Sequence, residues 1–373
     1  MPPKATITAV DPLTSNDLSS DFQFGASVAI SGTSALIGTP FAIDFGIGFG
    51  QFGAAYLFEN LTGNAEKLVL PPVPPGSGSS YAECGASVAL SNEYAVIGCP
   101  GFKESLGGTK IGAVIIYTRG STGVPRRITY QGSGSDAAAE GFGTSLSVNA
   151  GGILAIGSKT GHVQLVNLSN TIVLLTSTLD NGFDITDVAL NDSIPPLLAV
   201  GAIKEAGDRS GIALFENTLV VGSPGTQNDA NEVNAGRAFV YNNVTEDDFE
   251  AEVQPLPPST ESQPPTNALF GSSVAIADGA VVVGSPKYSS DGTAANSFGA
   301  AFFYNKNEEG KWYAPDFDSS SEEKQNPILG GTQGEQFGDA VAISDTAFVV
   351  GAPLYLFEKG IAVAYSYTSA TNP

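Results

Sequence analysis

The sequence predicts an all-β fold, a β-propeller built from four-stranded antiparallel blades. Three observations predict it: the chain is rich in glycine and proline, a strand–turn–strand unit recurs along it, and a third strand of constant signature follows most of these units. Glycine and proline are the poorest helix formers, so 45 glycines and 23 prolines among 373 residues favour short strands joined by turns. We expect residues 1–373 to form a single propeller domain.

The recurring unit begins with Phe-Gly, continues through two apolar strands joined by a tight turn, and ends with Gly-x-Pro. Copies run from Phe24 to Pro40, Cys84 to Pro100, Phe270 to Pro286 and Phe337 to Pro353, with a looser copy from Phe142 to Ser158. In the first four, ten positions separate the leading apolar residue of the first strand from the glycine that ends the second. Constant spacing indicates one hairpin geometry, because a slip of one residue would turn every side chain to the opposite face.

A third and a fourth strand complete each predicted blade. The third strand begins with Gly and carries apolar and aromatic residues, as in Gly53 to Phe58, Gly112 to Tyr117, Gly236 to Tyr241, Gly299 to Tyr304 and Gly360 to Tyr365, and more weakly in Gly161 to Val166. The fourth strand is more polar, as in Lys67 to Leu70. Four antiparallel strands are the unit from which propellers repeat radially.

The number of blades depends on the middle of the chain. Two inner hairpins lie close together there, one from Asp187 to Gly201 and one from Ile212 to Gly222. Elsewhere, 59 to 67 residues separate the glycine that ends one second strand from the glycine that ends the next. Here the two successive separations are 44 and 21 residues, and their sum is about one ordinary separation. We favour seven blades with the fourth short of its outer strands; the alternative is six blades with an inserted hairpin.

The two ends of the chain are predicted to meet. The last unit stops after its third strand, whereas the N-terminal segment Ala5 to Val10 has the character of a fourth strand. We expect this segment to complete the last blade and so remove an open sheet edge.

These units resemble FG-GAP repeats, the family that builds the seven-bladed head of integrin α chains, over nearly the whole chain. The resemblance implies an extracellular binding or adhesion module. The family's calcium loops are missing, because the turns at 31–34, 91–93, 277–279 and 344–346 are too short to offer the six or more oxygens that calcium takes. No metal site or cofactor is therefore assigned. The acid–amide run 228–232 lies in another loop, where we favour a solvated loop over weak cation binding.

Two cysteines occupy matching positions of one unit. Cys84 stands where other copies have Phe, and Cys99 stands between the second-strand Gly and the Pro. Antiparallel pairing brings these positions nearly opposite one another, which predicts a disulfide; the alternative is two buried free thiols. A disulfide indicates an oxidising compartment, so we expect an extracellular or cell-surface protein. Residues 1–4 lack the apolar stretch of a signal peptide, so a leader would already have been removed.

The charge balance argues against two classes of partner. The chain has 16 basic and 38 acidic residues, for a net charge of −22. Such a surface repels phosphate backbones and anionic lipids, so we expect neither nucleic acid nor membrane binding. No apolar run approaches the roughly 18 residues of a membrane helix, so we expect no membrane insertion.

No constellation of residues predicts catalysis, and the protein is not expected to be an enzyme. The single histidine, His162, excludes a histidine-cluster metal site and argues against a Ser-His-Asp hydrolase; we expect it to face solvent or a neighbouring group. The acid pairs 247–248 and 322–323 lie in polar linkers, where solvated carboxylates are expected rather than a glycosidase pair. Trp312 and Tyr313 suggest a sugar-stacking platform less strongly than packing against a blade edge.

Binding is expected at the loops that follow Gly-x-Pro, because a propeller presents loops from many blades on one face. These loops run over 41–52, 101–111, 225–235 and 287–298, and their weak candidate residues are Asp44, Phe45, Lys103, Glu104, Asp229, Asn231, Glu232 and Asp291. The expected partner is a protein or a glycan. The alternatives are a structural subunit of a cell-surface filament or coat and a carbohydrate-active propeller enzyme.

Overall fold

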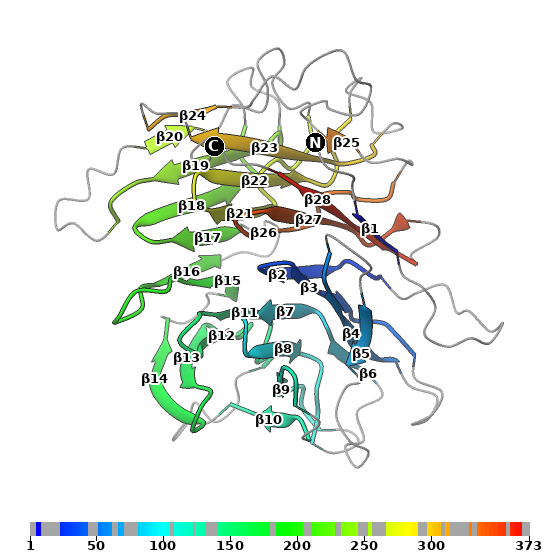
Figure 1. Ribbon diagram of the computed structural model, residues 1–373, viewed down its shortest axis with the longest axis vertical. Coiled ribbons are helices and arrows are strands. Elements are labelled where there is room, and N and C mark those ends of the chain that lie inside the picture. The colour runs from blue at the N-terminus through cyan, green and yellow to red at the C-terminus, as the bar shows by residue number, and fades with distance from the viewer. Residues whose placement is uncertain are drawn as a thin grey trace.

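A computed structural model describes most of the chain as seven antiparallel sheets whose first strands lie near a common centre (Figure 1). The described residues are 5–8, 23–43, 51–61, 66–70, 81–104, 108–121, 124–130, 140–179, 184–203, 211–227, 233–244, 253–255, 266–289, 297–306, 310–313, 328–329, 334–355 and 359–367. No helix in this part of the chain is both long enough and apolar enough to cross a membrane.

Each sheet is one blade, numbered here in chain order. Blade 1 consists of β2 (Ser27–Ser31), β3 (Ser34–Thr39), β4 (Gln51–Glu59) and β5 (Glu66–Leu70). Blade 2 consists of β7 (Ser87–Leu90), β8 (Tyr94–Cys99), β9 (Ala113–Thr118) and β10 (Arg126–Ile128). Blade 3 consists of β11 (Ser145–Val148), β12 (Ile153–Gly157), β13 (His162–Asn167) and β14 (Ile172–Thr178). Strand β6 (Tyr81–Cys84) leads into blade 2 and pairs in parallel with β4 of blade 1.

Blade 4 is the short one. Among the described strands, it holds only β15 (Asp184–Leu190) and β16 (Leu198–Ile203). Blade 5 holds β17 (Ile212–Phe215), β18 (Thr218–Ser223), β19 (Arg237–Tyr241) and β20 (Val253–Pro255). Blade 6 holds β21 (Ser273–Ala277), β22 (Ala280–Ser285), β23 (Ala300–Lys306) and β24 (Trp312–Tyr313), and β25 (Ile328–Leu329) also pairs with β23. As far as the chain is described, this agrees with the prediction of a fourth blade short of its outer strands.

The last blade contains both ends of the described chain, as predicted. It consists of β26 (Ala340–Ile343), β27 (Ala347–Ala352), β28 (Ile361–Ser366) and the N-terminal strand β1 (Ala5–Thr8). Strand β1 pairs antiparallel with β28, with Ala5 opposite Ala364 and Thr8 opposite Ile361. The N-terminal strand therefore closes the ring.

A central channel of about 370 Å³ decides the blade count. It is lined by residues of β2, β7, β11, β15, β17, β21 and β26, which are the first strands of all seven blades. Because β15 and β17 both reach the channel, the two hairpins in the middle of the chain belong to separate blades. The propeller has seven blades rather than six with an inserted hairpin.

The core lies between blades rather than at the centre. Each of the seven junctions between neighbouring blades contains one cluster of buried apolar side chains. Five of these clusters contain 9 to 13 buried residues. The two that flank blade 4 contain only five and three. Both junctions of blade 4, which has no outer strand within the described residues, thus contain fewer buried apolar residues than the other five.

The repeated Phe-Gly and Gly-x-Pro sequences make the contacts that join one blade to the next. Gly38 of blade 1 packs against the backbone of Gly85 in blade 2 so closely that a Cβ at Gly38 would lie 2.1 Å from the Gly85 carbonyl oxygen. The same oxygen accepts a 2.8 Å hydrogen bond from Ser27 Oγ. We call this serine-to-carbonyl bond the clasp; it recurs from Ser87 to Gly143 and from Ser273 to Gly338.

Candidate ligand-binding face

The loop that leaves the second strand of a blade is fixed at both ends by the same two backbone hydrogen bonds. In blade 2, the Cys99 carbonyl accepts from Phe102 N at 3.0 Å, and the Phe102 carbonyl accepts from Gly112 N at 3.1 Å. The corresponding pairs are Thr39–Ala42 and Ala42–Gly53 in blade 1, Ser223–Thr226 and Thr226–Gly236 in blade 5, and Ser285–Tyr288 and Tyr288–Gly299 in blade 6. The first bond closes a turn around the proline, and the second starts the third strand.

This arrangement separates the loop from the blade. The two hydrogen bonds meet at one residue, so the chain between that residue and the third-strand glycine can vary in sequence without disturbing the sheet. All four loops leave the second strand at the same end of their blades, so the four lie on one face. Loops held at their ends by a rigid scaffold are where binding residues concentrate in folded proteins.

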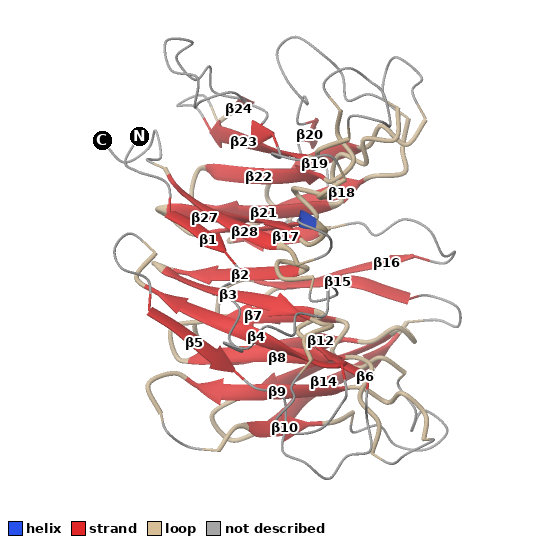
Figure 2. Ribbon diagram, turned by 90° about the vertical axis from the view of Figure 1, so that its right-hand side faces the viewer, coloured by secondary structure: helices blue, strands red, loops and turns tan. Residues whose placement is uncertain are grey.

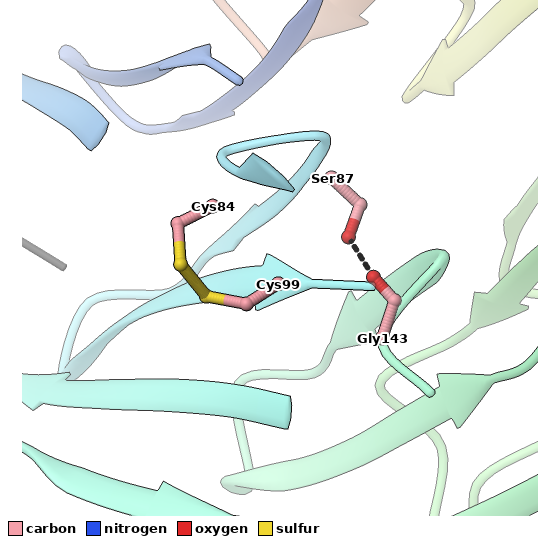
Figure 3. Close-up of a disulfide and its surroundings, with 4 residues drawn as sticks. All are labelled: Cys84, Ser87, Cys99 and Gly143. Atoms are coloured by element: carbon pink, nitrogen blue, oxygen red, sulfur yellow. Dashed lines mark hydrogen bonds between the residues drawn. A yellow bond between two sulfur atoms is a disulfide. The ribbon is translucent and has the colours of Figure 1, made fainter. Parts of the chain in front are cut away.

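The predicted disulfide lies at the base of the blade 2 loop (Figure 3). Cys84 and Cys99 are bonded, their Cα atoms are 3.9 Å apart, and both residues are buried. Cys84 ends β6 and Cys99 ends β8, so the bond joins the segment that enters blade 2 to the residue whose carbonyl begins the loop. The disulfide fixes the point from which the face loop projects.

Further contacts hold the first part of this loop. Phe102 is buried, and the Arg127 guanidinium lies 4.9 Å from the centre of its ring. Gly101 N donates to the Ala82 carbonyl at 3.0 Å. Lys110, near the end of the loop, forms a 2.8 Å ion pair with Glu83, at a partly exposed position where such pairs contribute little to stability.

The structure describes two of the eight candidate binding residues. Lys103 and Glu104 follow Phe102 directly in the blade 2 loop; Lys103 is half-buried and Glu104 is exposed. The other six candidates, Asp44, Phe45, Asp229, Asn231, Glu232 and Asp291, lie outside the described residues. Their role in binding remains a prediction.

The aromatic candidates weighed for chemistry have structural positions. His162 is buried rather than facing solvent, with Nδ1 3.0 Å from Thr160 Oγ1 and its ring 5.0 Å from that of Tyr130. Trp312 lies in β24 and is buried, with Lys306 Nζ 5.7 Å from its ring centre. Trp312 thus belongs to a fourth strand rather than a linker, and its burial fits packing better than sugar stacking. The acid pairs at 247–248 and 322–323 lie outside the described residues.

The described part of the chain contains no group of three or more His, Cys, Asp or Glu side chains that could hold a metal ion. No resident cation is assigned to this face.

One buried ionisable group at the channel was missed by the sequence interpretation. Asp187 occupies the position in blade 4 that Ser27, Ser87 and Ser273 occupy in their blades, opposite the second-strand glycine. Burial raises the pKa of its carboxyl group to about 7, although hydrogen bonds from Ile212 N and Val188 N lower it in part. Asp187 lines the channel, but both its oxygens accept from backbone N–H groups, which gives the carboxyl group a structural role. Aligning the inner strands residue by residue would have revealed this exchange of serine for aspartate.

Comparison with known proteins agrees with this architecture. Residues 7–58 match the family model described as FG-GAP repeat. No curated protein matches the sequence. Among solved structures, the WD40 repeats of RRP9 superpose with a TM-score of 0.54 at 11% identity over 98% of this chain and 100% of that one. The structure of U3-55K superposes with a TM-score of 0.53 at 13% identity over 92% and 95% of the two chains. At such identities the likeness shows a shared β-propeller fold.

Proposed function

We propose that this FG-GAP-type propeller is a non-catalytic extracellular binding or adhesion module that engages a protein or a glycan through its face loops. The observation that carries the proposal is the pair of backbone hydrogen bonds that fixes the ends of the loop in blades 1, 2, 5 and 6. This geometry is that of a rigid support with variable segments on one face. Propellers of the WD40 type, which share the fold, provide the same kind of multi-loop surface.

The extracellular part of the proposal is supported by the disulfide between Cys84 and Cys99. Disulfides persist in oxidising compartments and are rare where glutathione keeps thiols reduced. The bond joins segments at the base of a face loop, so oxidation would also hold that loop in position.

The test replaces one face loop and leaves its ends intact. In the variant, residues 103–110 become a Gly-Ser linker of equal length, while Phe102 and Gly112 keep their hydrogen bond. The matched control replaces Ser169 and Asn170, two exposed residues of the turn that joins β13 to β14. Because successive strands alternate in direction, this turn lies at the end of the blades opposite the face loops. Both variants should melt close to the wild-type temperature.

Binding is then measured on a glycan array and by cross-linking to a cell-surface protein fraction. We expect ligands that are lost with the face-loop variant and retained by the turn variant. Equal capture by both variants together with a silent array would contradict the proposal. Concentration-dependent assembly in light scattering would favour a filament or coat subunit instead, and hydrolysis abolished by one acidic substitution would favour an enzyme.

A further inference from the structure

Blade 4 leaves a sheet edge open within the described structure. In the other six blades, the second strand pairs along its outer edge with a third strand, as β8 does with β9 from Tyr94 to Cys99. Strand β16 pairs only with β15 among the described strands. Its sequence from Leu198 to Ile203 contains no charged residue and no proline, which are the usual means of preventing another strand from pairing with an edge.

Strand β16 is also exposed where its counterparts are covered. The second strands β3, β8, β22 and β27 are buried at all six positions, whereas all six residues of β16 are partly or fully exposed. Val200, in the middle of the strand, exposes 36% of its surface. Figures 1 and 2 place β16 between the strands of blade 3 and those of blade 5.

The face of blade 3 that flanks this edge is apolar and partly exposed. Leu165 of β13 packs against the cluster between blades 3 and 4 and lies opposite Leu175 of β14. Cross-strand partners share a face, so Leu175 lies on the side toward blade 4, where it is 44% exposed. The residues corresponding to Leu165 in blades 1 and 2, Leu57 and Ile116, are buried under the next blade.

The face of blade 5 shows the same exposure from the other side. Leu219 and Val221 of β18 pack against the cluster between blades 4 and 5, and their cross-strand partners in β19 are Tyr241 and Phe239. Both aromatic residues are half-buried. In blade 6, the corresponding Tyr304 and Phe302 are buried in the cluster shared with blade 5.

We propose that an extended segment of a partner protein adds to blade 4 as its third strand, antiparallel to β16, and covers the apolar faces of blades 3 and 5. Strand addition to an open edge uses backbone hydrogen bonds for affinity and side-chain contacts on the two faces for specificity. This surface is separate from the face loops, and the proposal does not depend on them.

The six complete blades define the chemistry of the partner segment. Their third strands begin with a glycine in the left-handed region, such as Gly112 at φ 76° and Gly236 at φ 89°. The residues that follow are mostly apolar or aromatic, and the polar exceptions include His162, Gln164 and Arg237. The partner strand should therefore be mostly apolar, with a glycine at its start. A chain of net charge −22 repels a second copy of itself, so we assign the site to a partner with neutral or basic flanks.

The test uses the chain's own third strands as probes against the full-length protein. Peptides spanning 112–118 and 236–241, each with two added lysines for solubility, are labelled and titrated by fluorescence anisotropy. Amide hydrogen exchange of residues 198–203 is followed with and without peptide. Peptides of the same composition with alternate residues N-methylated serve as controls, because they cannot pair with an edge.

Two variants place a charge on the site, and one places it elsewhere. Val200→Lys and Leu175→Lys should weaken peptide binding by roughly tenfold or more, because the added charge would be buried by the incoming strand. Val124→Lys, at a position 83% exposed in blade 2, should bind as the wild type does. Using two substitutions on different strands keeps the test valid if one of them lowers the melting temperature.

The expected result is peptide binding with protection of the β16 amides, lost in both site variants and kept in the Val124→Lys variant. Failure of both peptides to protect β16 would overturn the proposal, as would unchanged binding in the two site variants. Slow exchange of the β16 amides in the free protein would mean that the chain covers its own edge. Dimerisation that Val200→Lys abolishes would assign the edge to a second copy and also overturn the proposal.

Discussion

The carboxylate of Asp187 accepts a hydrogen bond from the backbone N–H of Ile212 across the junction between blades 4 and 5, with 3.0 Å between Oδ2 and N. At three other junctions, the side chain at this position is a serine that donates to a carbonyl of the next blade. Here the side chain accepts, and the backbone of the next blade donates. Among the described residues, the cluster at this junction has three buried apolar side chains, fewer than at any other junction.

This contact predicts a particular pH dependence of stability. Burial raises the pKa of the Asp187 carboxyl group in the folded protein to about 7, from an ordinary value of 3.8. Folding therefore favours the protonated form of Asp187. The stability that this preference adds is complete below pH 4 and is lost as the pH rises through 7. Between the unfolded and folded pKa values, the free energy of unfolding should fall by at most about 1.4 kcal/mol for each unit of pH.

The variant Asp187→Asn tests this, because asparagine keeps the shape and one acceptor oxygen but cannot ionise. At pH 5 the free energy of unfolding of the variant should be lower than that of the wild type, because the variant has lost one acceptor. By pH 8 the difference between the two free energies should narrow or reverse. Urea melts at several pH values measure both curves, and the effects of other titrating groups cancel in the difference. Parallel curves would show that Asp187 does not titrate in this range.

Replacing the inner-strand serine by alanine should have opposite effects on stability in blades 2 and 3. Ser87 Oγ donates to the Gly143 carbonyl at 2.7 Å across the junction of blades 2 and 3 (Figure 3). Ser87→Ala would leave that buried carbonyl without this partner and should cost about 1–2 kcal/mol in urea denaturation. Ser145 has the same place in blade 3, but its buried Oγ has no hydrogen-bond partner within the described structure.

The reason lies in blade 4, where Ile185 stands at the position of the acceptor glycine and packs near Gly157. Ser145→Ala should therefore be neutral or stabilising, since it removes an unpaired buried hydroxyl. A loss in Ser145→Ala equal to that in Ser87→Ala would mean that serine packing, rather than the clasp, accounts for the effect.

The sequence was sufficient to predict the features that depend on local spacing. Ten-residue hairpins, the disulfide and the closing strand all follow from the position of a residue within its own repeat. The clasps could not be found this way, because Ser27 and Gly85 belong to different blades and are 58 residues apart in the chain. The exposure of Phe239 and Tyr241 likewise depends on what the neighbouring blade lacks, which no local pattern records.

The disulfide should stabilise the protein by constraining the unfolded chain. It spans 15 residues, and closing a loop of this length is worth roughly 3 kcal/mol in the chain-entropy model. Reduction, or the double substitution Cys84→Ala with Cys99→Ala, should lower the melting temperature in calorimetry. The matched control is Cys84→Phe with Cys99→Ser, which restores the residues of the sixth blade, Phe270 and Ser285, and so should recover the packing but not the cross-link. Unchanged melting on reduction would show that the bond contributes nothing to stability.

Closure of the ring by β1 predicts that the N-terminal segment is needed for stability. Deleting residues 1–11 removes the strand that pairs with β28 from Ile361 to Ala364 and leaves that edge open. The melting temperature should fall sharply, and the protein should aggregate on heating, since an unpaired edge can pair with other chains. Deleting residues 1–4 alone is the control, because it leaves all of β1 in place and should melt as the full chain does. If both deletions melt at the wild-type temperature, the pairing of β1 with β28 does not close the propeller in solution.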